Sequence, residues 1–328
     1  MMMIGTAMMA VMPTYAVIGV AAPVLVVIAR LLQGFSVGGE FGSATAFLVE
    51  HSATRKGFLA SWQWASQGLT ALVASIFGVL LTGILTEPQL LSWGWRVPFF
   101  FGLLLGPIGI YIRRRMAETP EYTAIEPTKT PVRDLLRRHS VAVILAIGAS
   151  ILSNSSNYLI LYIPTYAVKE LGLPQSTGFV ATLIGAVILS SVSPFSGHWS
   201  DRIGRARIML TMSVVFLVTA YPIFWLMVAY PSITTAILAA GWLSLIKAGY
   251  SGVLPSFLAE LFPTATRGIG MSLSYSISVT IFGGFAPLIA TWLIAQTGDP
   301  LSPSFYLIFT AVLSMLALSF AGGRLLHQ

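Results

Sequence analysis

The sequence contains no cysteine and few charged residues, and each shortage excludes a class of protein. Without cysteine the chain can form no disulfide, bind no metal through thiolates and offer no thiol nucleophile. Charged residues make up 9% of the chain, whereas soluble domains carry about 25%. A chain with so few charges cannot cover a surface that faces water. The composition therefore predicts an integral membrane protein.

Motifs for catalysis and nucleotide binding are also missing. The four histidines lie at predicted helix ends or in loops and show no metal-ligand spacing. The sequence has no glycine-rich phosphate loop, so we expect no direct use of ATP. Residues 34–38 (GFSVG) fit a hydrolase pattern, but that motif needs a strand-to-helix elbow and here lies within a predicted helix. We expect no enzyme, no cofactor, no metal and no cleavable signal.

Hydrophobic residues make up 56% of the chain, and the mean hydropathy is +0.83. They form long continuous runs instead of alternating, which predicts an all-α, polytopic membrane helix bundle rather than a barrel. Polar punctuation separates about ten predicted spans of about 20 residues or more, with a shorter first one. Their expected limits are 1–14, 20–49, 57–85, 97–113, 141–168, 178–199, 207–229, 233–260, 268–296 and 303–324.

Basic residues separate by side of the membrane. The loops after every second predicted span hold 14 of the 18 lysines and arginines, while the opposite loops hold only Arg96 and Lys169. The 14 are Arg55, Lys56, Arg113, Arg114, Arg115, Lys129, Arg133, Arg137, Arg138, Arg202, Arg205, Arg207, Arg267 and Arg324. This asymmetry places the basic side, with the linker and the C-terminus, in the cytoplasm. The net charge of +7 is then a topology signal rather than a nucleic-acid footprint.

The longest polar segment, 114–140, divides the chain into an N-terminal bundle (1–113) and a C-terminal bundle (141–328). Its prolines and mixed charge are typical of a cytoplasmic linker with at most a short surface helix, and its basic cluster is expected to contact lipid headgroups. A repeat joins the bundles: FLVE at 47–50 with RKG at 55–57 resembles FLAE at 257–260 with RG at 267–268. By this offset, the first-half equivalent of loop 197–207 would precede residue 1. We therefore expect two N-terminal helices to be missing.

The predicted span 20–49 carries two charges, Arg30 and Glu40, well away from its ends. On a helix Arg30, Gln33, Val37 and Glu40 fall within an arc of about 80°. Charges in hydrocarbon are costly, so such residues normally face a watery cavity or a partner. The stripe is either a buried structural ion pair or part of a transport pathway.

Other predicted spans also hold polar groups at membrane depth. Lys247 lies near the centre of 233–260, with Tyr250 one turn on, and is costly there unless an anion or a carboxylate answers it. Substrate contact, pairing with Glu40 and snorkelling stay open for this lysine. Polar residues at helical spacing line the remaining spans: Asn154, Asn157, Tyr158 and Tyr162 in 141–168, and Gln63 and Gln67 in 57–85.

The loop 197–207 (GHWSDRIGRAR) joins two spans on the predicted cytoplasmic face. Asp201 can oppose the positive start of a helix, and the arginines can clamp carboxylates or helix ends of the other bundle. Such a cluster can hold one conformation shut. The spacing of Gly197, Asp201, Arg202, Gly204 and Arg205 is more particular than a plain basic loop needs.

Together these motifs closely resemble the major facilitator superfamily, in its branch of metabolite–proton symporters. The resemblance covers essentially the whole chain, from the family's third helix to its twelfth. It is carried by the 197–207 loop, RLLQG at 30–34, GGE at 38–40, GWRVPF at 94–99, ETP at 118–120, and ELFP at 260–263 with RG at 267–268. Within the branch, SWQ at 61–63, SQ at 66–67, PTY at 164–166 and TGD at 297–299 are most similar to citrate and tricarballylate transporters. The branch also includes carriers of 2-oxoglutarate, shikimate, and betaine or proline.

The resemblance implies a monomeric two-bundle carrier with alternating access in the bacterial inner membrane. The family's first, fourth, seventh and tenth helices line its cavity, and the last three of these correspond to spans 20–49, 141–168 and 233–260. The implied partners are a small-molecule substrate, protons and the lipid bilayer, with no nucleic acid. The resemblance also implies a gating loop, formed by Gly197, Asp201, Arg202, Gly204 and Arg205.

These readings converge on proton-coupled symport of a small organic anion. Arg30 and Lys247 would neutralise substrate carboxylates, and Glu40, with Arg30 nearby, would carry the proton. Two cations favour a di- or tricarboxylate such as citrate over a zwitterion. The expected substrate-binding residues are Arg30, Gln33, Gln63, Asn154, Asn157, Tyr158, Tyr162, Lys247 and Tyr250. A betaine or proline symporter, a truncated remnant that does not transport, and a membrane enzyme without a catalytic constellation are the alternatives.

Overall fold

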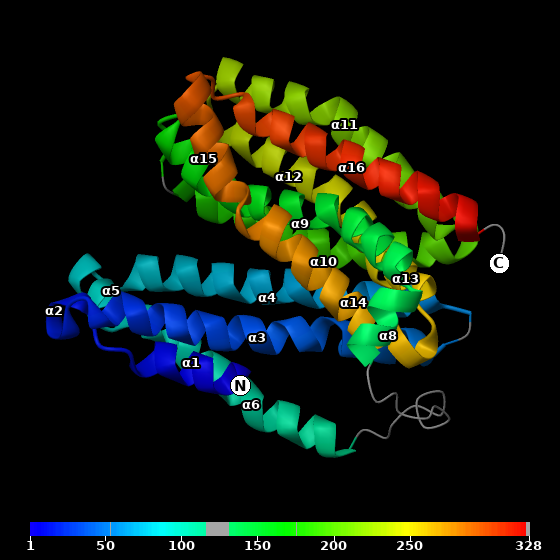
Figure 1. The fold of residues 1–328 in the computed structure, drawn as a ribbon. Helices are drawn as coiled ribbons and strands as arrows, with labels where there is room; N and C mark the ends of the chain where they lie inside the picture. Colours follow the sequence, from blue (N-terminus) through cyan, green and yellow to red (C-terminus); the bar gives the residue numbers. More distant parts are fainter. Residues whose placement is uncertain (53, 116–130, 175, 326–328) are drawn as a thin grey trace.

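The computed structural model describes the chain except residues 53, 116–130, 175 and 326–328. Every regular element in that part is a helix (Figure 1). Before residues 116–130, which are not described, lie α1 (Met2–Val11), α2 (Tyr15–Ile18), α3 (Ala21–Glu50), α4 (Lys56–Ile84), α5 (Glu87–Ser92), the 3-10 helix η1 (Gly94–Arg96) and α6 (Val97–Arg115).

The remaining helices follow the part of the linker that is not described. They are α8 (Pro131–Arg138), α9 (Ser140–Lys169), α10 (Ser176–Ile203), α11 (Arg205–Ala229), α12 (Ile233–Ser251), α13 (Leu254–Leu261), α14 (Thr264–Ser278), the π-helix η2 (Val279–Gly284), α15 (Ala286–Thr297) and α16 (Ser302–Leu325). Figure 1 shows α1, α3, α4 and α6 on one side of the molecule and α9 to α12, α15 and α16 on the other. The predicted boundaries at 113 and 141 stay a prediction.

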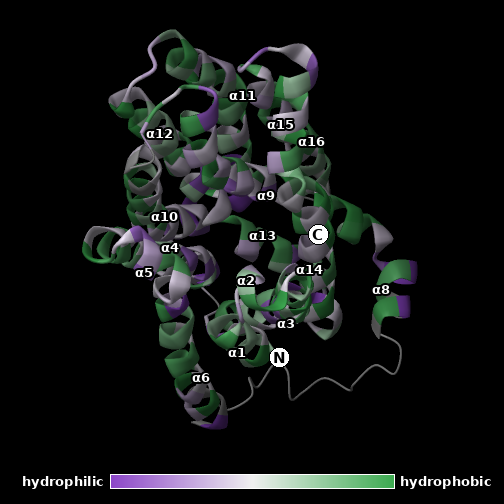
Figure 2. Ribbon diagram, turned by 90° about the vertical axis from the view of Figure 1, so that its left-hand side faces the viewer, coloured by the Kyte–Doolittle hydropathy of each residue, from purple (hydrophilic) through white to green (hydrophobic). Residues whose placement is uncertain are grey.

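Eight segments in the described part are long and apolar enough to cross a membrane. They are Ala21–Glu50, Lys56–Ile84, Ser140–Lys169, Val180–Ile203, Arg205–Ala229, Ile233–Leu261, Thr264–Thr297 and Ser302–Ala321. These correspond to eight of the predicted spans. The other two predicted spans hold α1, which has only 10 residues, and α6, which is outside this set of eight. Figure 2 shows hydrophobic residues along the long helices and hydrophilic ones on α8 and at helix ends.

Two predicted spans are interrupted rather than straight. The span predicted at 233–260 breaks into α12 and α13 at Gly252, where a Cβ atom would stand 2.3 Å from Ser196 Oγ of α10. Pro255 then lies in the first turn of α13, the helix position that proline favours. In the span predicted at 268–296, the π-helix η2 separates α14 from α15. A π-segment locally changes the path of a helix and is frequent at functional sites.

The helices α4 and α10 cross closely at one end of the molecule. A Cβ atom on Gly57 would stand 2.4 Å from Ser200 Oγ and 2.5 Å from the carbonyl oxygen of Gly197. Since no side chain fits at such a distance, glycine is required for the two backbones to approach this far. Farther along α4, Gly68 meets the backbone of Ser190 in the same way. The two helices therefore stay in contact over several turns.

The helix α3 makes the second contact between the early and late parts of the chain. A Cβ atom on Gly42 would stand 2.1 Å from the carbonyl oxygen of Gly268, and the Gly42 N–H donates to Ser272 Oγ at 3.2 Å. Next to it, the rings of Phe41 and Tyr275 stack with centroids 3.8 Å apart. The small-residue positions of α3 thus position it against α14, and Phe41 joins the main hydrophobic core of the later helices.

Candidate functional site

The polar centre of the molecule lies on α9. Asn154 is 1% exposed, and its Nδ2 donates to Ser278 Oγ of α14 at 3.1 Å. Its Oδ1 has no hydrogen-bond partner among the described atoms. An unpaired acceptor at such depth is costly, so a water molecule or a ligand donor would be stabilising there. Ser153 pairs with Ser251 of α12 at 2.7 Å and extends the polar contacts to a third helix.

Lys247 of α12 lies one helical turn from this point. Its side chain is buried, and the residue as a whole is 4% exposed. The ammonium nitrogen Nζ donates to Asn157 Oδ1 of α9 at 2.5 Å and stands 5.1 Å from the centre of the Trp64 ring of α4. Three helices from both sides of the linker therefore meet at one cation.

No carboxylate forms an ion pair with Lys247 in the described part of the chain. The three ion pairs found there involve only Arg205 and Arg267 as cations. Of the interpretations left open by the sequence, pairing with Glu40 and snorkelling are both wrong, because Nζ points at Asn157 and Trp64 inside the protein. Contact of Lys247 with a substrate anion stays a prediction. An amide oxygen and an aromatic ring stabilise an ammonium only partly compared with a carboxylate.

Each of the three predicted tyrosines contacts a neighbouring helix. Tyr158 lies against η2, where a Cβ atom on Gly283 would stand 2.9 Å from its ring. The Tyr162 hydroxyl accepts a hydrogen bond from Thr291 Oγ1 of α15 at 3.1 Å. The Tyr250 hydroxyl donates to the carbonyl oxygen of Ala149 at 2.6 Å and is fully buried. Tyr250 therefore fastens α12 to α9, and its binding role stays a prediction.

The charged stripe of α3 lies apart from Lys247. Arg30 is exposed, and its Nη1 donates to Gln33 Oε1 at 3.2 Å. Gln33 Nε2 in turn donates to Thr6 Oγ1 of α1 at 3.2 Å. Glu40 is exposed as well. Within the described residues neither Arg30 nor Glu40 contacts Lys247, so the structure does not bring the three predicted ions together.

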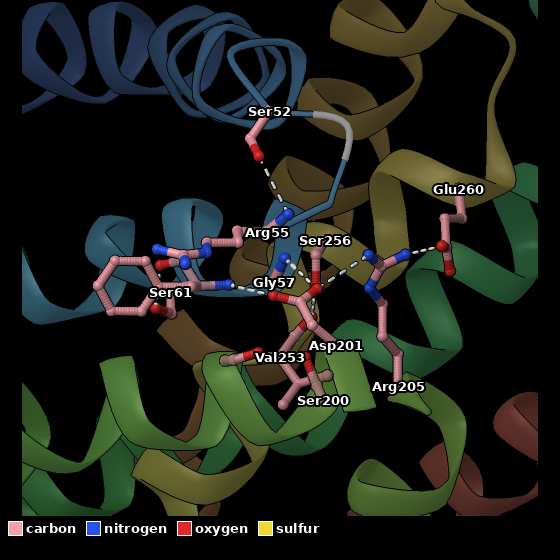
Figure 3. Close-up of polar contacts among 12 residues, drawn as sticks. Ser52, Arg55, Gly57, Ser61, Ser200, Asp201, Arg205, Val253, Ser256 and Glu260 are labelled. Atoms are coloured by element: carbon pink, nitrogen blue, oxygen red, sulfur yellow. Dashed lines mark hydrogen bonds and ion pairs between the residues drawn. The ribbon is translucent and has the colours of Figure 1, made fainter. Parts of the chain in front are cut away.

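Asp201 organises the end of the molecule at which α4 begins, as Figure 3 shows. Its Oδ1 accepts the Gly57 N–H at 2.7 Å and its Oδ2 accepts the Phe58 N–H at 3.0 Å. The carboxylate of α10 thus caps the positive start of α4 across the gap between two helices. The helix-start contact expected of Asp201 is confirmed, whereas gating by this loop stays a prediction.

Arginines extend this cluster to the neighbouring helices. Arg205 Nη2 lies 3.4 Å from Asp201 Oδ1, and Arg205 Nη1 also pairs with Glu260 of α13. Arg267 Nη1 of α14 pairs with Glu50 Oε1 of α3 at 3.0 Å. Ion pairs and caps therefore link both early helices to late ones at this end. We call Glu50, Asp201, Arg205, Glu260 and Arg267 the arginine-rich cluster.

The other predicted loop residues have different roles. Gly197 provides the close crossing with Gly57. Gly204 has φ of 103°, a conformation that favours glycine, and forms the sharp turn between α10 and α11. Arg202 is exposed, and Gln63 is half-buried on α4 one position before Trp64.

Sequence reasoning missed Trp64, Ser278 and the pairing of Glu50 with Arg267. A tryptophan in an apolar helix looks the same whether it faces lipid or a buried cation, so nothing in the local pattern marks Trp64. Glu50 had a usable signal, because it is the repeat counterpart of Glu260. Both glutamates belong to the arginine-rich cluster.

Comparison with known proteins now identifies the family. The sequence pattern of the Major Facilitator Superfamily matches residues 1–193, and that of the group described as Sugar (and other) transporter matches residues 124–321. The chain belongs to the major facilitator superfamily. Membership of this superfamily confirms the predicted fold class, a polytopic membrane helix bundle, and fits a transporter rather than an enzyme.

Curated relatives of this facilitator-superfamily chain fall into two groups. A citrate-proton symporter of Klebsiella pneumoniae is 37% identical over 330 residues, which are 95% of this chain and 71% of that protein. A citrate-proton symporter of Salmonella typhi is 32% identical and covers 95% of this chain and 73% of its own length. A putative proline/betaine transporter of Staphylococcus aureus (strain MSSA476) is 31% identical, with 98% of this chain and 70% of that protein covered.

Solved structures share the fold at much lower identity. The proton:xylose symporter XylE bound to 6-bromo-6-deoxy-D-glucose superposes with a TM-score of 0.77 at 16% identity. The match covers 97% of this chain and 77% of the symporter. A crystal structure of a D-xylose-proton symporter gives a TM-score of 0.71 at 17% identity, over 98% and 77%. At these identities the likeness shows the fold alone.

Proposed function

We propose that this chain transports a small organic anion, a di- or tricarboxylate such as citrate, together with protons by alternating access. The observation that carries the proposal is Lys247, a buried cation held by Asn157 and Trp64 without a carboxylate partner in the described residues. A substrate carboxylate would supply the missing negative charge. The citrate-proton symporters among the relatives support the same substrate class and the same coupling.

Within this proposal the binding residues surround Lys247. Asn157 orients the ammonium, and Asn154 offers an unpaired amide oxygen one turn away. Substrate hydroxyl or protonated carboxyl groups are suitable donors to that oxygen. Arg30 and Gln33 form a second polar pair on α3, and an anion with more than one carboxylate would engage them in another stage of transport. Glu40 and Lys247 are the two ionisable candidates for the proton.

The proposed mechanism uses the arginine-rich cluster as one of two alternating closures. Asp201 and the pair Arg267–Glu50 join helices that would have to separate for that end to open. We place this end in the cytoplasm of a bacterial inner membrane and treat the carrier as a monomer. The division into bundles at 1–113 and 141–328 belongs to the same proposal.

A zwitterion such as betaine or proline is the second candidate substrate, because a putative proline/betaine transporter and an ectoine/proline transporter are also among the relatives. The site itself favours the anion. The Trp64 ring, which is the kind of surface that binds a quaternary ammonium, already faces the ammonium of Lys247. A quaternary ammonium placed there would have to compete with the lysine Nζ for the face of that ring.

Uptake of labelled citrate into proteoliposomes under an imposed pH gradient tests the proposal. We expect the wild type to accumulate citrate, Lys247→Gln to lose at least nine-tenths of uptake, and Lys169→Gln to keep it. Lys169 is a matched control because it is exposed at the end of α9. Accumulation of betaine or proline with no entry of any di- or tricarboxylate would overturn the substrate class. Failure of the wild type to move any of these solutes would favour the remnant that does not transport.

A further inference from the structure

Resting on the proposed function, we infer that Lys247, and not Glu40, is the residue whose protonation couples the anion to the proton. The amine of Lys247 binds the co-transported proton when the substrate carboxylate arrives and releases it when the carboxylate leaves. The step balances, because the nitrogen lone pair accepts one proton from solution and one substrate charge is neutralised by it. No oxidant, reductant or covalent intermediate is involved.

The surroundings of Lys247 contain no fixed negative charge in the described part of the chain. From α9 it meets the neutral amide of Asn157, and from α4 the ring of Trp64. On the turn of α12 that follows Lys247, α10 presents Ser193 and Ser196 to Ala248 and Gly252, and α11 presents Met212 to Gly249; none of these three side chains carries a charge. On α12 itself, the hydroxyl of Tyr250 is already used by a backbone carbonyl. The charge on Lys247 therefore has no permanent counter-ion.

A buried ammonium without a counter-ion is an unfavourable species. The cation–π contact and one amide hydrogen bond offset only part of the lost hydration. A carboxylate placed against Nζ forms a charge-assisted hydrogen bond and removes the remaining imbalance. The occupied site consequently holds lysine and carboxylate as a pair, while the empty site is better served by the neutral amine.

Thermodynamic linkage then makes the coupling reciprocal. If the anion favours proton binding at Lys247 by some factor, the proton favours anion binding by the same factor. Reorientation would be easy in two states only: with Lys247 protonated and the anion bound, or with Lys247 neutral and the site empty. A carrier restricted to these two states moves the anion and the proton together. The helices that hold the site come from both sides of the linker. A change of charge at Lys247 therefore acts at the contact between the two sides, which would have to move against each other during reorientation.

Glu40 lacks the features that such a coupling needs. It is exposed on α3, and its carboxylate contacts no cation in the described residues. Nothing in the structure therefore ties the proton of Glu40 to the arrival of an anion at Lys247.

The test separates exchange from proton-driven accumulation in proteoliposomes. Lys247→Arg carries a permanent positive charge at the same position, so we expect citrate counterflow to persist within about tenfold of wild type. Accumulation driven by a pH gradient should fall to the level reached without a gradient. Glu40→Gln should accumulate citrate as the wild type does. Gradient-driven accumulation by Lys247→Arg, or its loss in Glu40→Gln alone, would overturn the inference.

A second measurement needs no substitution at Lys247. Purified wild-type protein in weakly buffered detergent solution, at a pH where citrate is fully ionised, should take up close to one proton for each citrate bound, and Glu40→Gln should take up the same amount. Citrate binding without proton uptake by the wild type would overturn the inference while leaving the proposed substrate intact. If the wild type neither binds nor exchanges citrate, the proposed function fails instead.

Discussion

Replacing Asp201 by asparagine is the most direct test of the arginine-rich cluster. The carboxylate accepts the Gly57 N–H at 2.7 Å and the Phe58 N–H at 3.0 Å, and it lies 3.4 Å from Arg205 Nη2. Asparagine keeps the shape and one acceptor oxygen, but it directs an NH2 group at one of the two amide donors. It also removes the negative charge from the start of α4. We expect Asp201→Asn to favour conformations in which α4 and α10 separate at this end.

The size of the effect follows from these contacts. A hydrogen bond to a charged group contributes about 1.5–3 kcal/mol, and a charge at a helix end contributes about 0.3–2 kcal/mol. Because the two contributions overlap in one carboxylate, we expect a combined loss of about 2–3 kcal/mol. Since about 1.4 kcal/mol corresponds to a factor of ten, the open population should rise by about 30- to 140-fold. Asp201 has an exposed side-chain fraction of only 9%, so solvent screening reduces this estimate little.

Single-cysteine labelling can measure that change, because the natural chain has no cysteine to remove. Ser61→Cys is a near-isosteric probe at a fully buried position of α4, where the backbone of Gly197 approaches it. We expect a small maleimide to label this cysteine at least tenfold faster when Asp201→Asn is added. Arg202→Gln is the matched control, since it removes an exposed charge from the adjacent position. Equal labelling rates with and without Asp201→Asn would refute the reasoning.

Two further predictions concern the contacts between early and late helices. Gly57→Ala should lower the midpoint of thermal unfolding, measured by tryptophan fluorescence, by several degrees, because its Cβ would stand 2.5 Å from a backbone oxygen. Gly83→Ala on the same helix is the control, because its Cβ would meet no atom within 4 Å. Equal midpoints for the two variants would contradict the close crossing. Glu50→Gln, Arg267→Gln and the double variant should show a coupling of about 1–3 kcal/mol in a double-mutant cycle. Additive effects in that cycle would show that the pair of Glu50 and Arg267 does not contribute to holding this end of the molecule closed.

Much of the candidate site could be found in the sequence as a set of polar residues, but not as contacts. Asn154, Asn157 and Lys247 were predicted because polar groups at membrane depth are costly and so mark function. Their partners were not predictable. Asn157 lies 90 positions from Lys247 in the chain, and Trp64 is farther still. Local periodicity cannot rank such pairs, because many apolar helix faces look alike.

For the charges of α3, the sequence predicted a role that the observed contacts do not reproduce. The pattern placed Arg30 and Glu40 on one stripe, and Arg30 was expected to neutralise the carboxylates of the same substrate as Lys247. In the structure Arg30 turns to Gln33 on its own helix, and Glu40 is exposed. A stripe defines which residues share a face, but the packing of neighbouring helices decides what that face meets.

By itself, the sequence determined that this protein is a membrane helix bundle and a member of the major facilitator superfamily. Hydropathy and charge are summed over many residues, so these conclusions do not depend on how any two helices pack. Tertiary structure alone decided that Lys247 meets an amide and an indole ring instead of a carboxylate, and that Asp201 caps a helix 144 positions away. Such contacts depend on a few ångströms of approach between helices, which glycines such as Gly57 and Gly197 permit and no local pattern specifies.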